Sequence, residues 1–240
     1  MAGQKTEPLV LLPGFLADAG LFRPQVEALS GDIPVTVAPT AGGERVEEIA
    51  SSLLGVLPGR IALLGHGFGG VVALELARRA PERIARIALI AATPLAGTPH
   101  ESAALEARIV AARSGRLSDA LEAEVPAAAL APGAGRGPVM AALREMAKRT
   151  GGPGYVRQLR AFQRRKDQQA VLHRLGRPTL ILCGAHDTLV PVKRHSFMAE
   201  MVPGATLEVI DDAGHLPTLE TPDAVTRAIR EWMGLPLVLG

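Results

Sequence analysis

The sequence has one cysteine, few aromatic residues (3%) and no marked excess of either charge. A single cysteine, Cys183, excludes an internal disulfide and favours a reducing compartment. The 26 Lys and Arg against 24 Asp and Glu leave a formal charge of +2, which disfavours a nucleic-acid partner. No stretch is long and apolar enough for a membrane span. Because the opening MAGQKTEPLV has no signal-peptide layout, we expect a cytoplasmic protein.

The 240 residues, 48% of them hydrophobic, suit one large domain that can bury a core. Short apolar runs predict strands, and their near-continuous apolar character is typical of strands covered on both faces. The predicted strands are Leu9–Leu12, Val35–Ala38, Arg60–Leu64, Arg86–Ala91, Thr179–Cys183 and Thr206–Ile210.

Amphipathic segments between these runs predict helices. They are Leu21–Leu29, Glu44–Leu57, Phe68–Ala80 and Pro222–Met233, and Asp18 is expected to cap the first. Strand-then-helix order predicts an α/β fold with a mostly parallel, doubly wound sheet. Ligands of such folds bind at the carboxyl ends of the strands.

One segment interrupts this alternation. Residues 95–170 contain no clear strand, are rich in Ala and Arg, and carry 12 Lys or Arg against 7 Asp or Glu. We interpret them as a helical cap or lid inserted into a core of residues 1–94 and 171–240. A set of surface helices with no lid role is the alternative.

Four motifs in a fixed order are the most informative feature. A strand runs into Gly65-His66-Gly67-Phe68-Gly69 and then directly into a helix, and Leu11–Leu16 ends the first strand. Cys183–Pro191 fits G-x-x-D-x-x-x-P, and Asp211–Pro217 follows the last strand. Together these motifs resemble the α/β-hydrolase superfamily, whose nucleophile sits in G-x-S-x-G at a tight strand-to-helix turn.

The resemblance implies a role for each matching position. Asp187 would be the acid of the catalytic triad and His215 its base, while the N–H groups of Phe15 and Phe68 would form the oxyanion hole. Gly67 would stand at the nucleophile position, where the family has serine. The expected reaction is hydrolysis of a carboxylic ester or a related acyl compound or lactone. The expected partner is a small-molecule acyl substrate, with no cofactor and no metal.

Simpler interpretations of these residues exist. His215 could bond only its own loop, and Asp187 could cap the segment that follows it. Asp211 and Asp212 are interpreted as turn formers rather than as the triad acid. His66 is expected to pack beside the turn rather than act as a base.

Gly67 itself has three explanations, because glycine has no group with which to attack a substrate. The first is that it replaces a nucleophilic serine in an inactivated variant. Alternatively, a natural member could activate water with His215 or act as a small-molecule-binding receptor. Third, Gly65, Gly67 and Gly70 satisfy the G-x-G-x-x-G dinucleotide fingerprint. The next strand ends without the carboxylate that such a site needs, so we disfavour the third explanation.

Overall fold

The computed structural model describes residues 7–237, so the first six residues of the N-terminal stretch considered above lie outside the described part. Within this range the strands form one six-stranded sheet in the order β2-β1-β3-β4-β5-β6, with every neighbouring pair parallel. The strands are β1 (Leu9–Leu12), β2 (Val35–Val37), β3 (Ile61–His66), β4 (Ile84–Ile90), β5 (Thr179–Gly184) and β6 (Thr206–Ile210). The predicted parallel α/β architecture is confirmed.

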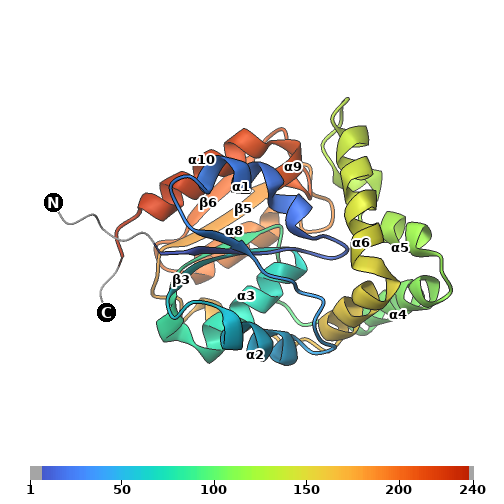
Figure 1. The fold of residues 1–240 in the computed structure, drawn as a ribbon, viewed down its shortest axis with the longest axis horizontal. Coiled ribbons are helices and arrows are strands. Elements are labelled where there is room, and N and C mark those ends of the chain that lie inside the picture. The colour runs from blue at the N-terminus through green and yellow to red at the C-terminus, as the bar shows by residue number, and fades with distance from the viewer. Residues whose placement is uncertain (1–6, 238–240) are drawn as a thin grey trace.

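Helices cover both faces of the sheet (Figure 1). The α-helices of the described part are α1 (Arg23–Leu29), α2 (Val46–Val56), α3 (Phe68–Arg79), α4 (Pro99–Arg113), α5 (Leu117–Glu124), α6 (Arg136–Gln163), α7 (Gln169–Leu172), α8 (Val192–Met201), α9 (Pro217–Glu220) and α10 (Pro222–Gly234). Short 3₁₀ helices are η1 (Ala19–Phe22), η2 (Pro81–Arg83) and η3 (Ala127–Ala129). None of the helices in residues 7–237 is long and apolar enough to cross a membrane.

Alternating side chains of the strands build two cores. Leu9 and Leu11 of β1 point into the core shared with α1 and α10, whereas Val10 and Leu12 point into the core shared with α2, α3 and α8. The period of two along a strand produces this division. Burial on both faces explains why the central strand β1 is apolar throughout.

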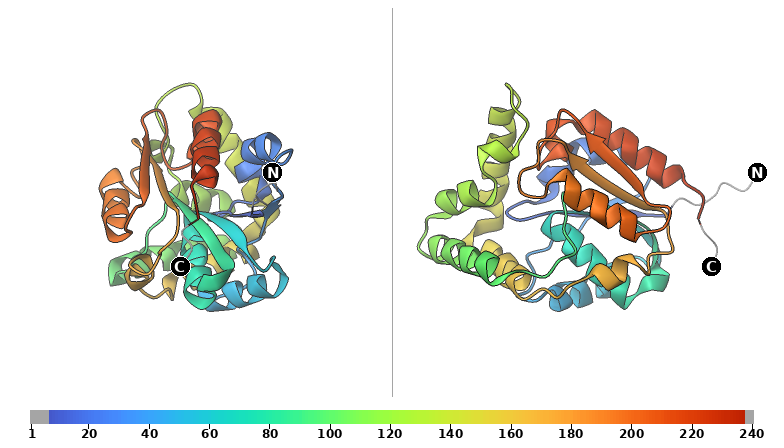
Figure 2. Two further views of the ribbon diagram at one scale, coloured as in Figure 1. Left: turned by 90° about the vertical axis from the view of Figure 1, so that its left-hand side faces the viewer. Right: turned by 180° about the vertical axis from the view of Figure 1, so that it is seen from behind.

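Helices α4, α5 and α6 lie beside the sheet rather than on its faces (Figures 1 and 2). They connect β4 to β5 and include no strand of the sheet. The Thr98 side chain and Glu101 form a reciprocal capping box at the start of α4. Within α6 the backbone of Gly151 is non-helical (φ 70°, ψ 163°), so α6 consists of two helices joined at a kink. The described chain between β4 and β5 is therefore helical, and its role as a cap or lid stays a prediction.

Most predicted elements lie where the sequence placed them, with shifted ends. The strand expected at Arg60–Leu64 runs to His66, and the strand expected at Arg86–Ala91 begins at Ile84. Asp18 caps the 3₁₀ turn η1, which precedes α1, by accepting a hydrogen bond from the Gly20 N–H. Helix α8 was not predicted.

Candidate active site

The turn between β3 and α3 is tightly packed except at one residue. A Cβ on Gly69 would lie 2.0 Å from the Leu12 carbonyl oxygen, and one on Gly65 would lie 2.4 Å from the Gly69 carbonyl oxygen. At Gly67 the nearest atoms would be 3.9 Å away. Packing therefore requires glycine at positions 65 and 69, whereas position 67 has room for a side chain.

Gly67 has backbone angles that few residues adopt. Its φ of 54° and ψ of −118° place it in the positive-φ region, and its N–H donates to the Ile90 carbonyl at 2.8 Å. Strained backbone of this kind is concentrated at functional sites. Gly70, by contrast, faces packed chain, since its Cβ would lie 2.5 Å from that of Ala92. The glycine pattern thus follows from chain packing and does not form an open phosphate cradle.

His215 and Asp187 form a buried pair. The Nδ1–H of His215 donates to Asp187 Oδ2 at 2.9 Å, so Nε2 is the unprotonated nitrogen of the neutral ring. The other carboxylate oxygen, Oδ1, accepts from the N–H groups of Leu189 and Val190 at 2.8 and 2.9 Å. The Asp187 side chain has no exposed surface, and that of His215 is 13% exposed. The carboxylate is therefore fully oriented by its own loop and by the imidazole.

Each member of the pair shifts the pKa of the other. Burial by itself would raise the pKa of Asp187, but the positive charge and hydrogen bond of His215, with the two loop N–H groups, lower it below its ordinary value. Burial would likewise lower the pKa of His215, yet the Asp187 carboxylate raises it above 6.5. The pair thus favours an ionised acid beside a histidine that accepts a proton readily.

His66 is the buried neighbour of this pair. Its Nε2–H donates to the carbonyl oxygen of His215 at 2.8 Å, which fixes the tautomer and leaves Nδ1 without a partner in the described part of the chain. Burial, followed by the charge of His215, lowers the pKa of His66 to about 3. His66 is therefore a neutral support for the His215 loop.

The loop after β1 is held by a residue from α6. The side-chain oxygen of Gln158 accepts from the Leu16 N–H at 3.1 Å, and its amide donates to the Gly14 carbonyl at 3.3 Å. Phe15 lies between these two anchors. Within residues 7–237, neither the Phe15 N–H nor the Phe68 N–H donates to a protein acceptor. Gln158 thus fixes the loop that carries one of the two predicted oxyanion donors.

A cavity of about 310 Å³ brings the predicted residues together. Phe15, Gly67, Phe68 and His215 line it from the strand ends, and the ring of Phe15 stacks on that of Phe68 with centroids 4.9 Å apart. The facing wall comes mainly from α4, α5 and the end of α6. It includes Ala104, Leu105, Arg108, Glu124, Phe162 and Arg165. The cavity therefore lies between the sheet and the helical insertion.

A charged pair stands on the helical wall. Glu124 accepts hydrogen bonds from Arg108 at 2.8 Å and from the Tyr155 hydroxyl at 2.5 Å. A second cavity of about 20 Å³ adjoins Gly67, Glu124 and His215. Its volume suffices for one water molecule.

Nothing in the sequence indicates that Glu124 and Arg165 line the cavity or that Gln158 bonds the loop after β1, because a helical pattern does not tell which polar residue turns inward. Asp211 and Asp212 are exposed and make no hydrogen bond to His215. Within the described residues, no three His, Cys, Asp or Glu side chains gather as metal ligands.

Known proteins resemble this chain over most of its length. The family described as alpha/beta hydrolase fold matches residues 53–222. A pimeloyl-[acyl-carrier protein] methyl ester esterase of Aromatoleum aromaticum is 31% identical over 76% of this chain and 78% of its own length. A poly(3-hydroxyalkanoate) depolymerase of Ectopseudomonas oleovorans is 28% identical over 94% of this chain and 84% of its own.

Solved structures agree with these sequence relatives. A thermophilic esterase from Thermogutta terrifontis, determined with malate bound, superposes with a TM-score of 0.86. The two sequences are 28% identical, and the match covers 95% of this chain and 89% of the esterase chain. The enol-lactonase from Burkholderia xenovorans has a TM-score of 0.82 at 24% identity, over 95% of this chain and 92% of its own. The latter match supports the fold.

Proposed function

The chain belongs to the α/β-hydrolase fold family, and from that premise we propose that it is a hydrolase of carboxylic esters, or of related acyl compounds or lactones, with Gly67 at the nucleophile position. The observation that carries the proposal is that His215, which is hydrogen-bonded to Asp187, lines one cavity together with Gly67. Esterases among the relatives support the same reaction class. The substrate is a small acyl molecule, and the reaction needs no cofactor.

The proposed chemistry follows from the positions of these groups. With serine at position 67, the hydroxyl would attack the ester carbonyl while His215 Nε2 takes its proton. The N–H groups of Phe15 and Phe68 would hold the resulting oxyanion, and the latter lies at the N-terminus of α3. His215 would return the proton to the leaving alkoxide. Water would then release the acid from the acyl-enzyme by the same steps.

Gly67 blocks this reaction at its first step, because it has no side-chain atom that could form the acyl bond. The room at position 67 supports the interpretation that a serine side chain belongs there, since a Cβ meets nothing within 3.9 Å. We therefore expect the Gly67 protein to bind acyl substrates and to hydrolyse them little or not at all.

The decisive experiment compares the Gly67 protein with Gly67→Ser on short p-nitrophenyl esters. We expect the serine variant to gain at least about a thousandfold in kcat/KM and to be labelled by a fluorophosphonate, because the nucleophile accounts for most of such catalysis. Gly67→Ala, which restores the Cβ without the hydroxyl, is the matched control and should stay inactive. An inactive, unlabelled and folded serine variant would contradict the proposal.

A second candidate is favoured by the cavity of about 20 Å³ beside Gly67, Glu124 and His215. A water in this space could be deprotonated by His215 and attack the ester directly. In that case the Gly67 protein itself would hydrolyse esters and His215→Ala would abolish the activity. Binding of esters by both forms without turnover in either would indicate a receptor.

A further inference from the structure

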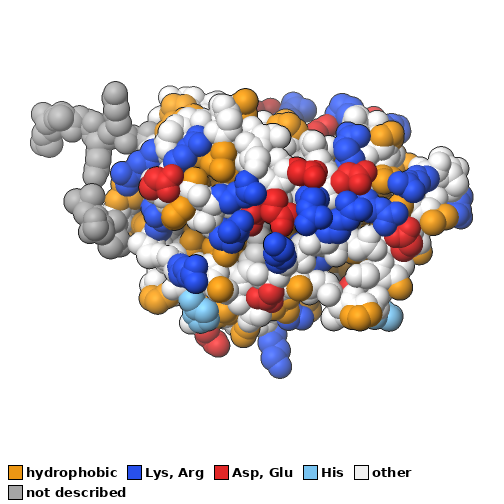
Figure 3. All heavy atoms as spheres, turned by 90° about the horizontal axis from the view of Figure 1, so that it is seen from below, with side chains coloured by type: hydrophobic (Ala, Val, Ile, Leu, Met, Phe, Trp, Pro, Cys, Tyr) orange, Lys and Arg blue, Asp and Glu red, His pale blue; other side chains and the backbone are white. Residues whose placement is uncertain are grey.

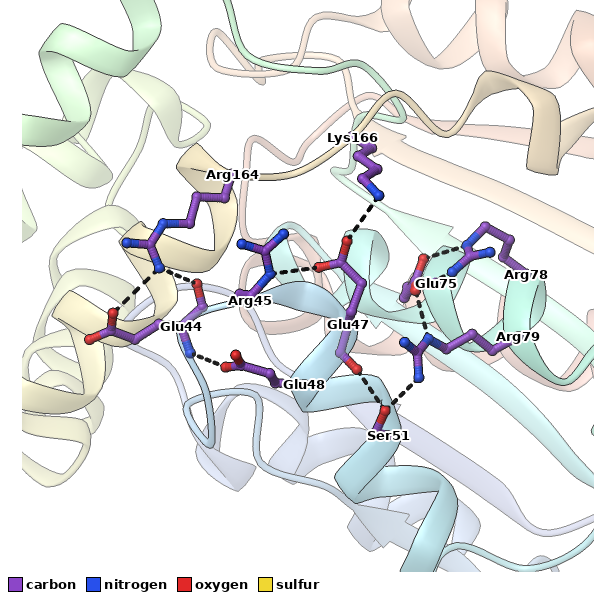
Figure 4. A network of polar contacts seen from close by, with 10 residues as sticks. All are labelled: Glu44, Arg45, Glu47, Glu48, Ser51, Glu75, Arg78, Arg79, Arg164 and Lys166. Atoms are coloured by element: carbon purple, nitrogen blue, oxygen red, sulfur yellow. Dashed lines mark hydrogen bonds and ion pairs between the residues drawn. The ribbon is translucent and has the colours of Figure 1, made fainter.

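Three consecutive cations near the end of α6 have different environments. Arg164 reaches Glu44 at 3.5 Å and Lys166 reaches Glu47 at 3.7 Å, both on the outer surface (Figure 4). This face carries acidic and basic side chains next to one another (Figure 3). Arg165, between them, is only 8% exposed and lines the cavity. One of three adjacent positive charges is therefore directed inward.

Neutral groups hold the buried guanidinium. The Nε–H of Arg165 donates to the Leu95 carbonyl at 2.8 Å, and Nη1 donates to the Phe162 carbonyl at 2.9 Å. The guanidinium carbon lies 3.5 Å from the centre of the Phe162 ring. Within residues 7–237, no carboxylate forms an ion pair with Arg165, and Nη2 has no protein acceptor. These contacts fix the direction of the cation without an ion pair to the described residues.

The other charges on this wall are already engaged. Arg108 is paired with Glu124. Glu101 also lines the cavity and its charge acts on Arg165, but its side chain is exposed and its Oε2 accepts from the Thr98 N–H at 2.7 Å in the capping box. Burial lowers the pKa of Arg165 to about 10, so the guanidinium remains charged at neutral pH. Arg165 thus gives the cavity an unpaired positive charge.

The aromatic cluster relates this charge to the proposed reaction centre. The Phe162 ring, over which Arg165 lies, has its centroid 5.1 Å from that of Phe15 and 6.1 Å from that of Phe68. One phenyl ring therefore separates the guanidinium from the residues proposed to bind the ester carbonyl. A ligand that reaches both must have its anionic group a few bonds from the reacting carbonyl.

We propose that Arg165 binds a carboxylate on the acyl part of the substrate, so that the preferred substrates are monoesters or lactones of short dicarboxylic acids. This inference rests on the proposed function. Guanidinium groups bind carboxylates through parallel N–H bonds, and such charged hydrogen bonds are stronger than neutral ones. Arg165 is already largely removed from water, so pairing adds only the desolvation cost of the incoming carboxylate, which the hydrogen bonds to the guanidinium would offset.

The test compares an anionic and a neutral ester of one acid, monomethyl and dimethyl glutarate, in the Gly67→Ser background. We expect the serine variant to prefer the monomethyl ester, and Arg165→Met to lower the ratio of the two kcat/KM values by about 10- to 100-fold. Arg165→Lys should retain part of the preference. The neighbouring variants Arg164→Met and Lys166→Met are matched controls, and each should leave the ratio unchanged.

Arg165 also bonds the backbone, so its replacement can lower the fraction of folded protein. The ratio of kcat/KM values for two substrates cancels that effect. An equal loss on both esters, or an unchanged ratio in a folded Arg165→Met protein, would overturn the inference. Calorimetry on the Gly67 protein tests binding without catalysis. The Gly67→Ser variant could hydrolyse neither ester while the Gly67 protein binds monomethyl glutarate only when Arg165 is present. That result would contradict the proposed function and would support the anion site.

Discussion

The two walls of the cavity differ in the kind of atoms that form them. The strand-end wall consists of backbone turns packed so closely that a Cβ on Gly69 would lie 2.0 Å from the Leu12 carbonyl oxygen, and Asp187 has no exposed surface. The helical wall consists of side chains from α4, α5 and α6, and its charges differ in pairing, as Glu124 and Arg165 show. The strand ends therefore hold the groups proposed for the reaction, and the helices hold those that would select the substrate.

This difference predicts unequal responses to mutation. Changes in the strand-end wall should affect all substrates or the fold itself, because its atoms have no room to move. Changes in the helical wall should affect some substrates more than others.

The largest effect is expected at Asp187. In the Gly67→Ser background, Asp187→Asn should lower kcat by about 10³- to 10⁴-fold on neutral and anionic esters alike, because the amide no longer fixes the His215 tautomer. It also removes the charge that raises the pKa of His215. Steady-state kinetics on both esters, with circular dichroism as the control for folding, measures this. A loss of kcat on only one ester, or a loss below tenfold, would contradict the view that strand-end residues act on all substrates.

Next comes the contrast between Gly69 and Gly67. Gly69→Ala should destabilise the fold by more than about 4 kcal/mol or prevent folding, since its Cβ would overlap the Leu12 carbonyl. Gly67→Ala has room and should cost only about 1–3 kcal/mol through its positive φ. Urea unfolding of the two variants checks the difference. Similar stabilities would mean that position 67 is as constrained as its neighbours.

Gln158 belongs to both walls in part, because it lies on α6 but bonds the loop after β1. Gln158→Leu should destabilise the fold by about 2–4 kcal/mol, since it leaves the Leu16 N–H and the Gly14 carbonyl buried without partners. In the serine background, we expect kcat to fall and KM to change little. Arg164→Leu, on the outer surface of the same helix end, serves as the control. Unchanged kcat in a stable Gln158→Leu protein would restrict α6 to substrate binding.

The smallest effect is a dependence of stability on pH. His66 has a pKa of about 3 in the fold and about 6.5 when unfolded, so only the unfolded chain takes up its proton between these values. The contribution of neutral His66 to the free energy of unfolding is complete above pH 6.5. It is lost as the pH falls towards 3, and the loss at pH 5 is about 2 kcal/mol. His66→Gln keeps a donor for the His215 carbonyl. The decrease in unfolding free energy from pH 7 to pH 5 should therefore be smaller in this variant than in the parent. Equal decreases would contradict the lowered pKa of His66.

The sequence predicted the strand-end wall more completely than the helical wall, for a physical reason. Turns such as Gly65–Gly69 and Gly184–Asp187 leave short motifs that can be read from the sequence, although Gly69 and Gly184 are required by contacts with the distant Leu12 and Ala213. The prediction that Asp187 and His215 belong together required only the order of motifs, and the structure places them 2.9 Å apart. Their catalytic role stays a prediction.

The helical wall depends on how α4, α5 and α6 rotate about their axes. Arg164, Arg165 and Lys166 are chemically alike, so only the packed structure distinguishes the inward residue. Helix α8 was missed for a related reason, because its buried side chains include His195 beside Met198 and Met201 and therefore give a weak apolar pattern. The boundaries predicted for the cap, residues 95–170, remain a prediction.

The environment of Cys183 makes the protein useful for covalent labelling. Its thiol is fully buried in β5, and burial raises its pKa to about 12, so alkylating reagents that need a thiolate should leave it unmodified in the folded protein. A cysteine introduced anywhere on the surface would then be the one reactive thiol, without any need to remove the native one. Placed on α4 or α6, it could carry a fluorophore that reports ligand entry between helices and sheet.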